Sequence, residues 1–156
     1  MVSEKILQKV QEILQSQDCQ EFLEKDSYSY IEEELGRLSS SNFPAKHQIK
    51  SIQNYFTLGG LQEAISYASH QREKLKKENK GVEFWEIFLD IFHLQKKSYL
   101  KQKLDSFLEK KSFPSKKEKQ NLQKLLQEKL GATLLEHFYC HALYQINKND
   151  PSISPS

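Results

Sequence analysis

Apolar residues in this chain recur at intervals of three and four, the spacing that places side chains on one face of a helix. After Ser3 the pattern runs through Ile6, Val10 and Ile13, and it returns in most later segments. No segment alternates apolar and polar residues for long enough to predict a strand. The sequence therefore predicts an all-α fold, a compact bundle of five to seven helices that includes αα-hairpins.

The size and composition of the chain fit one packed domain. It has 156 residues, and 37% of them are hydrophobic, which is enough material for a core. Five glycines and four prolines are too few for the many turns of an all-β protein. We expect a single helical domain over residues 1–146 and a flexible C-terminal tail over residues 147–156.

Glycines and prolines indicate where the middle helices begin and end. Pro44 suits the first turn of a helix, and Gly59-Gly60 suits its end, because glycine readily takes the left-handed conformation there. A helix over residues 61–75 follows, so the two are expected to form an αα-hairpin. Residues 84–92 form the most apolar segment and are expected to lie at the centre of the bundle.

Two pairs of residues have the spacing of a capping box, in which a polar side chain and an acid three positions later satisfy the first amides of a helix. Asp18 with Glu21 predicts a short second helix, which restarts after a first helix that ends near residue 17. Ser115 with Glu118 predicts the start of a long last helix, in which Gly131 is a possible bend.

The chain has no segment that resembles a membrane span or a signal peptide. The densest apolar stretch, residues 82–94, is interrupted by three carboxylates and a histidine. The first ten residues lack the apolar run of a signal peptide, and two cysteines that are far apart favour a reducing compartment. We expect a cytoplasmic protein that does not contact a membrane.

A metal site is the sharpest chemical candidate, and it is not favoured. His137 and His141 have the spacing that lets two imidazoles of one helix reach one metal, and Cys140 is nearby. A zinc site normally draws on four protein ligands, and aromatic residues fill the position where a hydrolase has its glutamate. A small metalloenzyme that adds His93 lacks the accompanying carboxylate pattern. We expect histidines that pack and form hydrogen bonds, with no metal and no cofactor.

No catalytic residue is predicted. Cys19 and Cys140 lie in helical segments flanked by leucine and phenylalanine, which favours a packing role. Glu32, Glu33 and Glu34 are consecutive, so they spread around a helix and do not converge on a substrate. They are expected to form a solvated face or to contact a basic neighbour.

Charge is unevenly distributed along the chain. Residues 1–43 contain nine acidic and four basic residues, whereas residues 44–156 contain 12 acidic and 19 basic residues. We therefore divide the domain into an acidic part, residues 1–43, and a basic part, residues 44–146. The acidic part of one copy could contact the basic part of another, which would give self-association.

Cations spaced four apart on the predicted helices are the best candidates for binding RNA. Each pair lies on one helix face, where it can neutralise sugar-phosphate backbone without reading bases. A solubilising surface would show the same pattern. We expect the three pairs to converge into one positive strip. The predicted RNA-binding residues are Lys46, Lys50, Arg72, Lys76, Lys97 and Lys101.

Two segments resemble the small helical subunit of type III-B CRISPR effector complexes. The stretch IKSIQNYFTLGGLQEAISY, residues 49–67, is similar to that family's helix, glycine-leucine turn and second helix. LQKLLQEKLGATLLEHFYCHAL, residues 122–143, resembles its terminal helix, with Phe138 and Tyr139 in the region where the family usually has a tryptophan. The best matching positions are Gly60, Leu61, Ala64 and Tyr67.

The resemblance implies a non-catalytic subunit, stacked in several copies along an RNA-guided effector complex. Such a subunit would contact the backbone of guide RNA and target RNA, and also neighbouring subunits, while other subunits cleave the target. The alternative is a helical adaptor that binds proteins, because Tyr55, Gly59 and Tyr67 also resemble one tetratricopeptide-type hairpin. No second hairpin follows at the 34-residue period that such an array requires.

Overall fold

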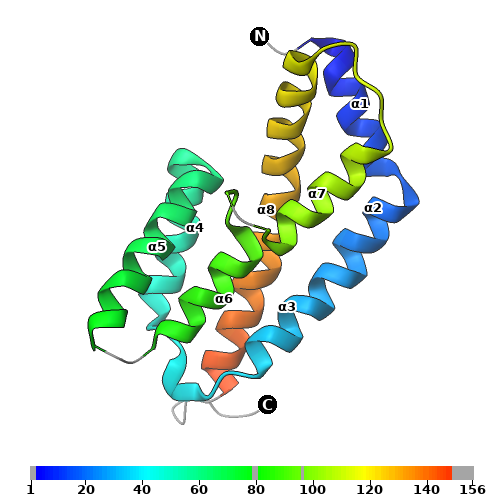
Figure 1. The fold of residues 1–156 in the computed structure, drawn as a ribbon. Helices are drawn as coiled ribbons and strands as arrows, with labels where there is room; N and C mark the ends of the chain where they lie inside the picture. The colour runs from blue at the N-terminus through cyan, green and yellow to red at the C-terminus, as the bar shows by residue number, and fades with distance from the viewer. Residues whose placement is uncertain (1–2, 79–80, 96, 149–156) are drawn as a thin grey trace.

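The computed structural model of the protein describes residues 3–78, 81–95 and 97–148 (Figure 1). These residues contain no strand, so the prediction of an all-α fold is confirmed. The elements are α1 (Glu4–Gln15), α2 (Gln17–Glu21), the π-helical turn η1 (Phe22–Asp26), α3 (Ser27–Gly36), the 3₁₀ turn η2 (Ser40–Asn42), α4 (Lys46–Gly59), α5 (Leu61–Glu78), α6 (Val82–Phe92), α7 (Tyr99–Glu109) and α8 (Lys116–Lys148).

The segment α2–η1–α3 runs without a break from residue 17 to residue 36, so the described residues form seven main helices. This agrees with the predicted five to seven. The last helix, α8, has 33 residues and is therefore about 50 Å long at 1.5 Å per residue. It packs against α1, α3, α4 and α7 and connects the two ends of the molecule (Figure 1).

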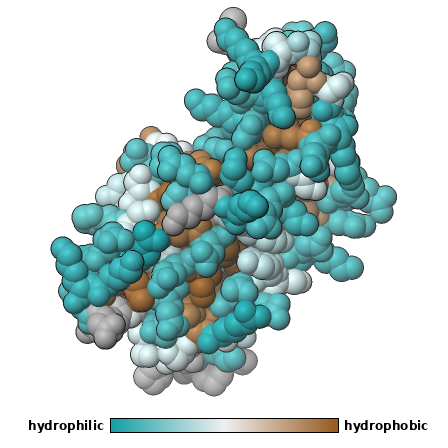
Figure 2. All heavy atoms as spheres, in the orientation of Figure 1, coloured by the Kyte–Doolittle hydropathy of each residue, from teal (hydrophilic) through white to brown (hydrophobic). Residues whose placement is uncertain are grey.

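The centre of one end is α6, as its sequence predicts. Phe84, Trp85, Phe88 and Phe92 are completely buried on it, and their rings pack against each other and against Phe138 of α8. Apolar atoms show along the course of α6 on the face in Figure 2, flanked by hydrophilic atoms. We call this part, α6 and the second half of α8, the aromatic end.

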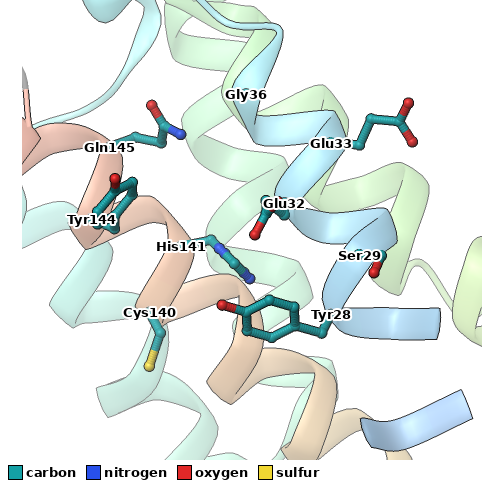
Figure 3. A pocket seen from close by; sticks show the side chains of 9 residues that line it. All are labelled: Tyr28, Ser29, Glu32, Glu33, Gly36, Cys140, His141, Tyr144 and Gln145. Carbon is teal, nitrogen blue, oxygen red and sulfur yellow. The ribbon is translucent and has the colours of Figure 1, made fainter. Parts of the chain in front are cut away.

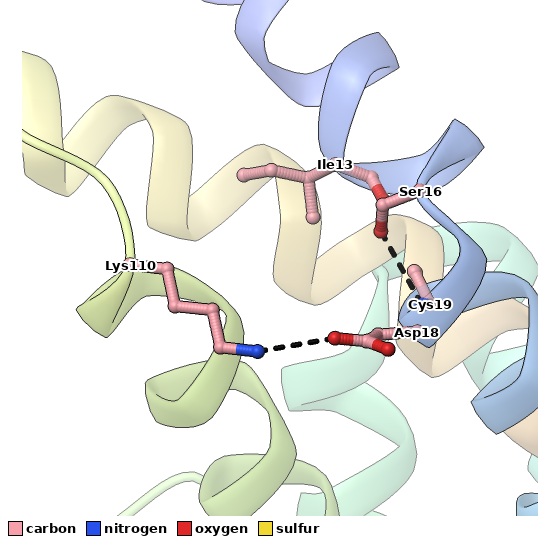
Figure 4. Close-up of polar contacts among 5 residues, drawn as sticks. All are labelled: Ile13, Ser16, Asp18, Cys19 and Lys110. Carbon is pink, nitrogen blue, oxygen red and sulfur yellow. Dashed lines mark hydrogen bonds and ion pairs between the residues drawn. The ribbon is translucent and has the colours of Figure 1, made fainter.

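The other end of the molecule has a different core. The buried side chains of α1, α7 and the first half of α8 are isoleucine, valine and leucine; they are Ile6, Val10, Ile13, Leu100, Leu104, Leu108, Leu122, Leu126 and Leu130. We call this part the aliphatic end. Its surface carries two ion pairs, Lys110 Nζ to Asp18 Oδ2 at 3.0 Å (Figure 4) and Lys111 Nζ to Glu12 Oε2 at 3.9 Å. Acidic residues of the first 43 thus contact basic residues of the same chain.

Two of the predicted helix starts are confirmed in detail. The hydroxyl of Ser3 accepts a hydrogen bond from the N–H of Ile6 at 3.3 Å, which caps α1. Ser115 lies one residue before α8, and its hydroxyl accepts a hydrogen bond from the N–H of Glu118 at 3.2 Å.

The predicted cap of the second helix is wrong. Ser16, and not Asp18, caps α2: its hydroxyl accepts from the N–H of Cys19 at 3.3 Å and donates to the carbonyl of Ile13 at 2.7 Å (Figure 4). One side chain therefore closes α1 and opens α2, so α1 ends at Gln15 and not near residue 17. This frees Asp18 for its ion pair with Lys110.

The αα-hairpin is confirmed, with one correction at its start. Gly60 has φ +80°, the conformation that lets α4 end and α5 begin one residue later. The rings of Tyr55 and Tyr67 stack across the hairpin with centroids 4.8 Å apart. Pro44 is not in the first turn of α4, because Ala45 is the N-cap and its N–H donates to Gln48 Oε1 at 3.1 Å.

The long helix fixes the hairpin at its turn. Glu128 of α8 accepts a hydrogen bond from the N–H of Leu61, an amide at the start of α5, at 3.3 Å. Gly131 lies against Leu61, and a Cβ on it would come within 3.0 Å of Leu61 Cδ2. The glycine that the sequence marks as a possible bend therefore permits a close approach of α5 to α8.

The C-terminal boundary differs slightly from the prediction. Residues 147 and 148, expected to begin the tail, belong to α8, and residues 149–156 lie outside the described part. Over the described residues, no helix combines the length and the apolar character needed to cross a membrane.

Candidate functional site

The two helices of the hairpin carry four of the six predicted RNA-binding residues. The Tyr55–Tyr67 stack sets the register of α4 against α5. Lys50 lies five residues before Tyr55, and Arg72 lies five residues after Tyr67. Lys46 and Lys76 each lie nine residues from the tyrosine of their own helix. Each cation of α4 therefore lies at the level of one on α5, at the end of the hairpin away from its turn.

Three of these four cations are exposed and have no ion-pair partner among the described residues; they are Lys46, Lys50 and Lys76. Arg72 is partly buried and pairs with Glu73, Nη2 to Oε1 at 3.3 Å. The Arg72 Nε is buried without a hydrogen-bond partner in the described structure. We call these four residues the hairpin cations.

The third predicted pair lies elsewhere. Lys97 precedes α7 and Lys101 is in its first turn, beyond the far end of α6 from the hairpin cations (Figure 1). The 11 residues of α6 alone separate the two groups by about 16 Å. Lys97 and Lys101 line a shallow hollow of about 490 Å³ that also contains Asp105 and Glu109. The positive surface is thus divided into two groups, and the second is mixed with acids.

A groove of about 780 Å³ lies between α3 and the second half of α8, beside the aromatic end (Figure 3). The described side chains around it are Tyr28, Ser29, Glu32 and Glu33 on α3, with Gly36 at its end, and Cys140, His141, Tyr144 and Gln145 on α8. They include two carboxylates and no lysine or arginine. The groove is therefore acidic, in contrast to the hairpin cations.

The π-helical turn η1 positions the α3 side of the groove. The carbonyl oxygen of Leu23, in this turn, accepts from the hydroxyl of Ser27 at 3.1 Å and lies 2.8 Å from Nε2 of His137. Since a carbonyl only accepts, His137 carries its proton on Nε2. This bond ties α8 to the turn just before Tyr28, whose ring packs edge-on against His141 with centroids 4.3 Å apart.

His141 is the most unusual side chain of the groove. It is only 6% exposed, and its Nε2 atom is buried without a hydrogen-bond partner in the described structure. Burial lowers the pKa of His141 below the ordinary 6.5, and the neighbouring His137 lowers it further, while the charge of Glu32 opposes the shift. The imidazole is therefore neutral near pH 7.

The two histidines do not form the metal pair that their spacing suggests. His137 is bonded to Leu23, and the sulfur of Cys140 points away from His141 (Figure 3). Within the described ranges, no three residues of the types histidine, cysteine, aspartate and glutamate lie close enough to hold a metal.

The cysteines differ from each other. Cys19 is buried, as its apolar neighbours predict, and burial raises the pKa of its thiol to about 11, which makes it a poor nucleophile. Cys140 is exposed, so a packing role is wrong for it. Of the three consecutive glutamates, Glu33 and Glu34 contact Arg37, the basic neighbour that was expected, and Glu32 faces the groove.

Sequence reasoning missed the groove because its two walls are more than 100 residues apart in the chain. A weak signal was present: Tyr28 and Glu32 are four apart on one helix, as are His137 and His141 on another. The spacing of three and four residues between Tyr28, Ile31 and Leu35 is typical of one buried helix face, but Tyr28 is 45% exposed and lines the groove.

Comparison of the chain with models of known protein families, with curated proteins and with solved structures found no match.

Proposed function

We propose that this protein is a non-catalytic helical subunit of a cytoplasmic, RNA-guided complex similar to type III CRISPR effector complexes. In this role the hairpin cations contact the backbone of guide or target RNA, and other surfaces contact neighbouring subunits, including further copies of the chain. The proposal rests on the resemblance of residues 49–67 and 122–143 to the small subunit of such complexes. The genes that flank the coding sequence test it directly, because the proposal requires genes for RNA-guided effector proteins among them.

The observation that carries the proposal is the group of four cations at the open end of the hairpin, where Lys46 and Lys50 of α4 lie at the levels of Lys76 and Arg72 of α5. The register of the Tyr55–Tyr67 stack places these cations at two successive levels, about 6 Å apart for a four-residue step. Exposed ammonium groups release counterions when they meet phosphates, which favours binding to a sugar-phosphate backbone. Lys97 and Lys101 form a separate and weaker contact, because acids lie beside them.

An RNA-binding assay against salt concentration tests the role of the hairpin. Fluorescence anisotropy of a labelled single-stranded RNA should give an affinity that falls steeply with salt, with a log–log slope near −3 if four phosphates are neutralised at about 0.7 each. The double variant Lys46→Glu/Lys50→Glu should lose most of this binding and reduce the slope by about 1.4 or more. The matched control Lys124→Glu/Lys129→Glu, with the same charge change on exposed positions of α8, should bind nearly as the unmodified protein does. Equal losses in the two variants would contradict a localised RNA contact.

A second candidate function, a protein-binding adaptor, is favoured by the groove between α3 and α8. The hairpin itself supports it less, since one hairpin is not an array. An adaptor would keep its protein partner at salt concentrations that release RNA.

A further inference from the structure

We propose that the groove between α3 and α8 binds an arginine- or lysine-bearing peptide segment of a protein partner. Tyr28 and Tyr144 would hold the aliphatic stem and the cationic group, and Glu32 and His141 would accept its N–H groups. This inference does not depend on RNA binding. Where the proposed function holds, it assigns the chemistry of one contact with a neighbouring subunit.

An unfilled hydrogen-bonding position lies just beneath the wall of the groove, where the exposed ring of Tyr28 packs against the imidazole of His141, so a ligand reaches it when this ring turns aside. Nε2 of His141 is buried and has no partner in the described structure, whereas Nε2 of His137, one turn earlier on α8, bonds to Leu23. A buried polar atom without a partner is costly, so a ligand that supplies the partner gains affinity. A neutral imidazole offers one nitrogen as an acceptor, and guanidinium and ammonium groups only donate.

Two exposed tyrosines frame this position. Tyr28 is 45% exposed and Tyr144 is 60% exposed, and in Figure 3 their side chains lie on either side of His141. The face of a tyrosine ring attracts a cation within about 6 Å of its centre. Tyrosine is also among the residues enriched in protein interfaces, because a rigid ring offers a large contact area with little loss of conformational freedom.

The charges of the groove select a cation. Glu32 makes no ion pair with the described residues, and its carboxylate points toward the groove beside His141 (Figure 3). Glu33 points away, and it lies 3.7 Å from Arg37. Glu32 is therefore available for a ligand and Glu33 is already compensated. The same carboxylates repel RNA and free phosphate, which excludes the ligand class proposed for the hairpin cations.

Titration of the isotopically labelled full chain, followed by NMR, tests the assignment. The probe is the capped peptide acetyl-Ala-Arg-Ala-Arg-Ala-amide, and its matched control carries citrulline, a neutral isostere, in place of each arginine. We expect the arginine peptide to shift the signals of Tyr28, Glu32, His141 and Tyr144, with an affinity at least about fivefold higher than that of the citrulline peptide, the factor that corresponds to one partly screened ion pair.

A pair of variants distinguishes the two carboxylates. Glu32→Gln should weaken binding of the arginine peptide about fivefold, and Glu33→Gln, with the same change of charge one residue away, should leave it nearly unchanged. Both positions are exposed, so neither substitution disturbs the core. Tyr144→Ala should also weaken binding, because it removes one aromatic wall.

Several results would overturn the proposal. These are shifts spread over the whole surface, equal affinity for the two peptides, equal effects of the two glutamate variants, or no shift at the solubility limit of the peptide. Shifts of the groove signals that grow with protein concentration alone would assign the groove to a second copy, and shifts caused by RNA would assign it to nucleic acid. The RNA assay with the hairpin variants is unaffected by these outcomes, so the two proposals can fail separately.

Discussion

The two ends of the molecule share α8 but are built from different side chains. In the aromatic end, Phe84, Trp85, Phe88 and Phe92 of one short helix pack edge-on or tilted against each other and against Phe138. The buried side chains of α1, α7 and the first half of α8 in the aliphatic end are isoleucine, valine and leucine, and its surface carries lysines, glutamines and acids. Large rings fill space with few side chains, so one eleven-residue helix can organise a core to which α3, α5 and α8 contribute.

The two ends also differ in which charged side chains are available to a binding partner. The groove and the hairpin cations both adjoin the aromatic end, where Arg37 and Arg72 form ion pairs but Glu32, Lys46, Lys50 and Lys76 form none with the described residues. In the aliphatic end the charges of the surface are partly used within the chain, between Lys110 and Asp18 and between Lys111 and Glu12. Surface acids near the N-terminus are thus less available to another copy than their number in the sequence indicates.

The largest loss of stability is expected for a substitution in the core of the aromatic end. Phe88→Ala should lower the free energy of unfolding by about 3–5 kcal/mol, because it removes a completely buried ring that contacts Phe92 and Phe138. Leu122→Ala, the matched change in the aliphatic end, removes fewer carbon atoms and should cost less than Phe88→Ala, within the range of about 2–5 kcal/mol for such changes. Chemical denaturation followed by circular dichroism measures both. A larger loss for Leu122→Ala would show that the aromatic cluster is not the better packed end.

A smaller effect is expected where the hairpin meets α8. Glu128→Gln keeps the shape of the side chain and removes the charge that faces the first amides of α5, so it should cost about 1 kcal/mol of stability. The control is Glu118→Gln, in the first turn of α8, because the Glu118 carboxylate forms no ion pair with another helix among the described residues. Equal losses in the two variants, measured by the same denaturation, would contradict the conclusion that Glu128 of α8 caps the start of α5.

The stability of the protein should depend on pH through His141, which lies in the groove between α3 and α8. Because burial lowers the pKa of His141, the unfolded chain binds a proton there more readily than the folded protein does. The stability from this site is fully present above the ordinary pKa of 6.5 and is lost as pH falls through the lower pKa of the folded state. Between about pH 7.5 and about pH 5 the unmodified protein should therefore lose more stability than His141→Gln.

The carboxylates are the same in both proteins, so the difference between the two pH profiles isolates His141 from Glu32 and the other acids. Parallel profiles would mean that the imidazole of His141 is protonated as easily in the folded protein as in the unfolded chain. An NMR titration of the ring of His141 would provide the same information directly.

The smallest effect is expected at the surface of the aliphatic end. Lys110→Ala should change the free energy of unfolding by less than about 0.5 kcal/mol, because both side chains of the Lys110–Asp18 pair are about two-thirds exposed, 68% and 67%. Raising the salt concentration should abolish the difference. A change above about 1 kcal/mol that persists in high salt would indicate that this pair is part of a coupled network.

Local chemistry explains what the sequence predicts well. The caps Ser3 and Ser115, the hairpin turn at Gly60 and the burial of α6 all depend on residues near each other in the chain, and each is found in the structure. The cap of α2 was misplaced because Ser16 and Asp18 both suit the position, and only the structure shows that Asp18 faces Lys110, 92 residues away.

Contacts between distant segments explain what was missed. The positive strip was predicted from pairs within helices, whereas the distance between pairs depends on the antiparallel order of α5, α6 and α7. The groove needs Tyr28 and His141 on neighbouring helices, and the π turn between α2 and α3 is joined to α8 by the hydrogen bond from His137 to the carbonyl of Leu23. Neither contact has a signature within one segment.

The π-helical turn between residues 22 and 26 has a consequence for how this part of the chain tolerates change. A π turn accommodates one residue more than an α-helical turn of the same length, so deleting one residue there would allow regular α-helix throughout. The residues beyond the deletion would keep nearly the same direction about the helix axis, because the wider turn had absorbed the extra residue. Ile31 and Leu35 would therefore stay in the interior, whereas deleting one residue in the first turn of α3 would rotate both of them by about 100° away from it.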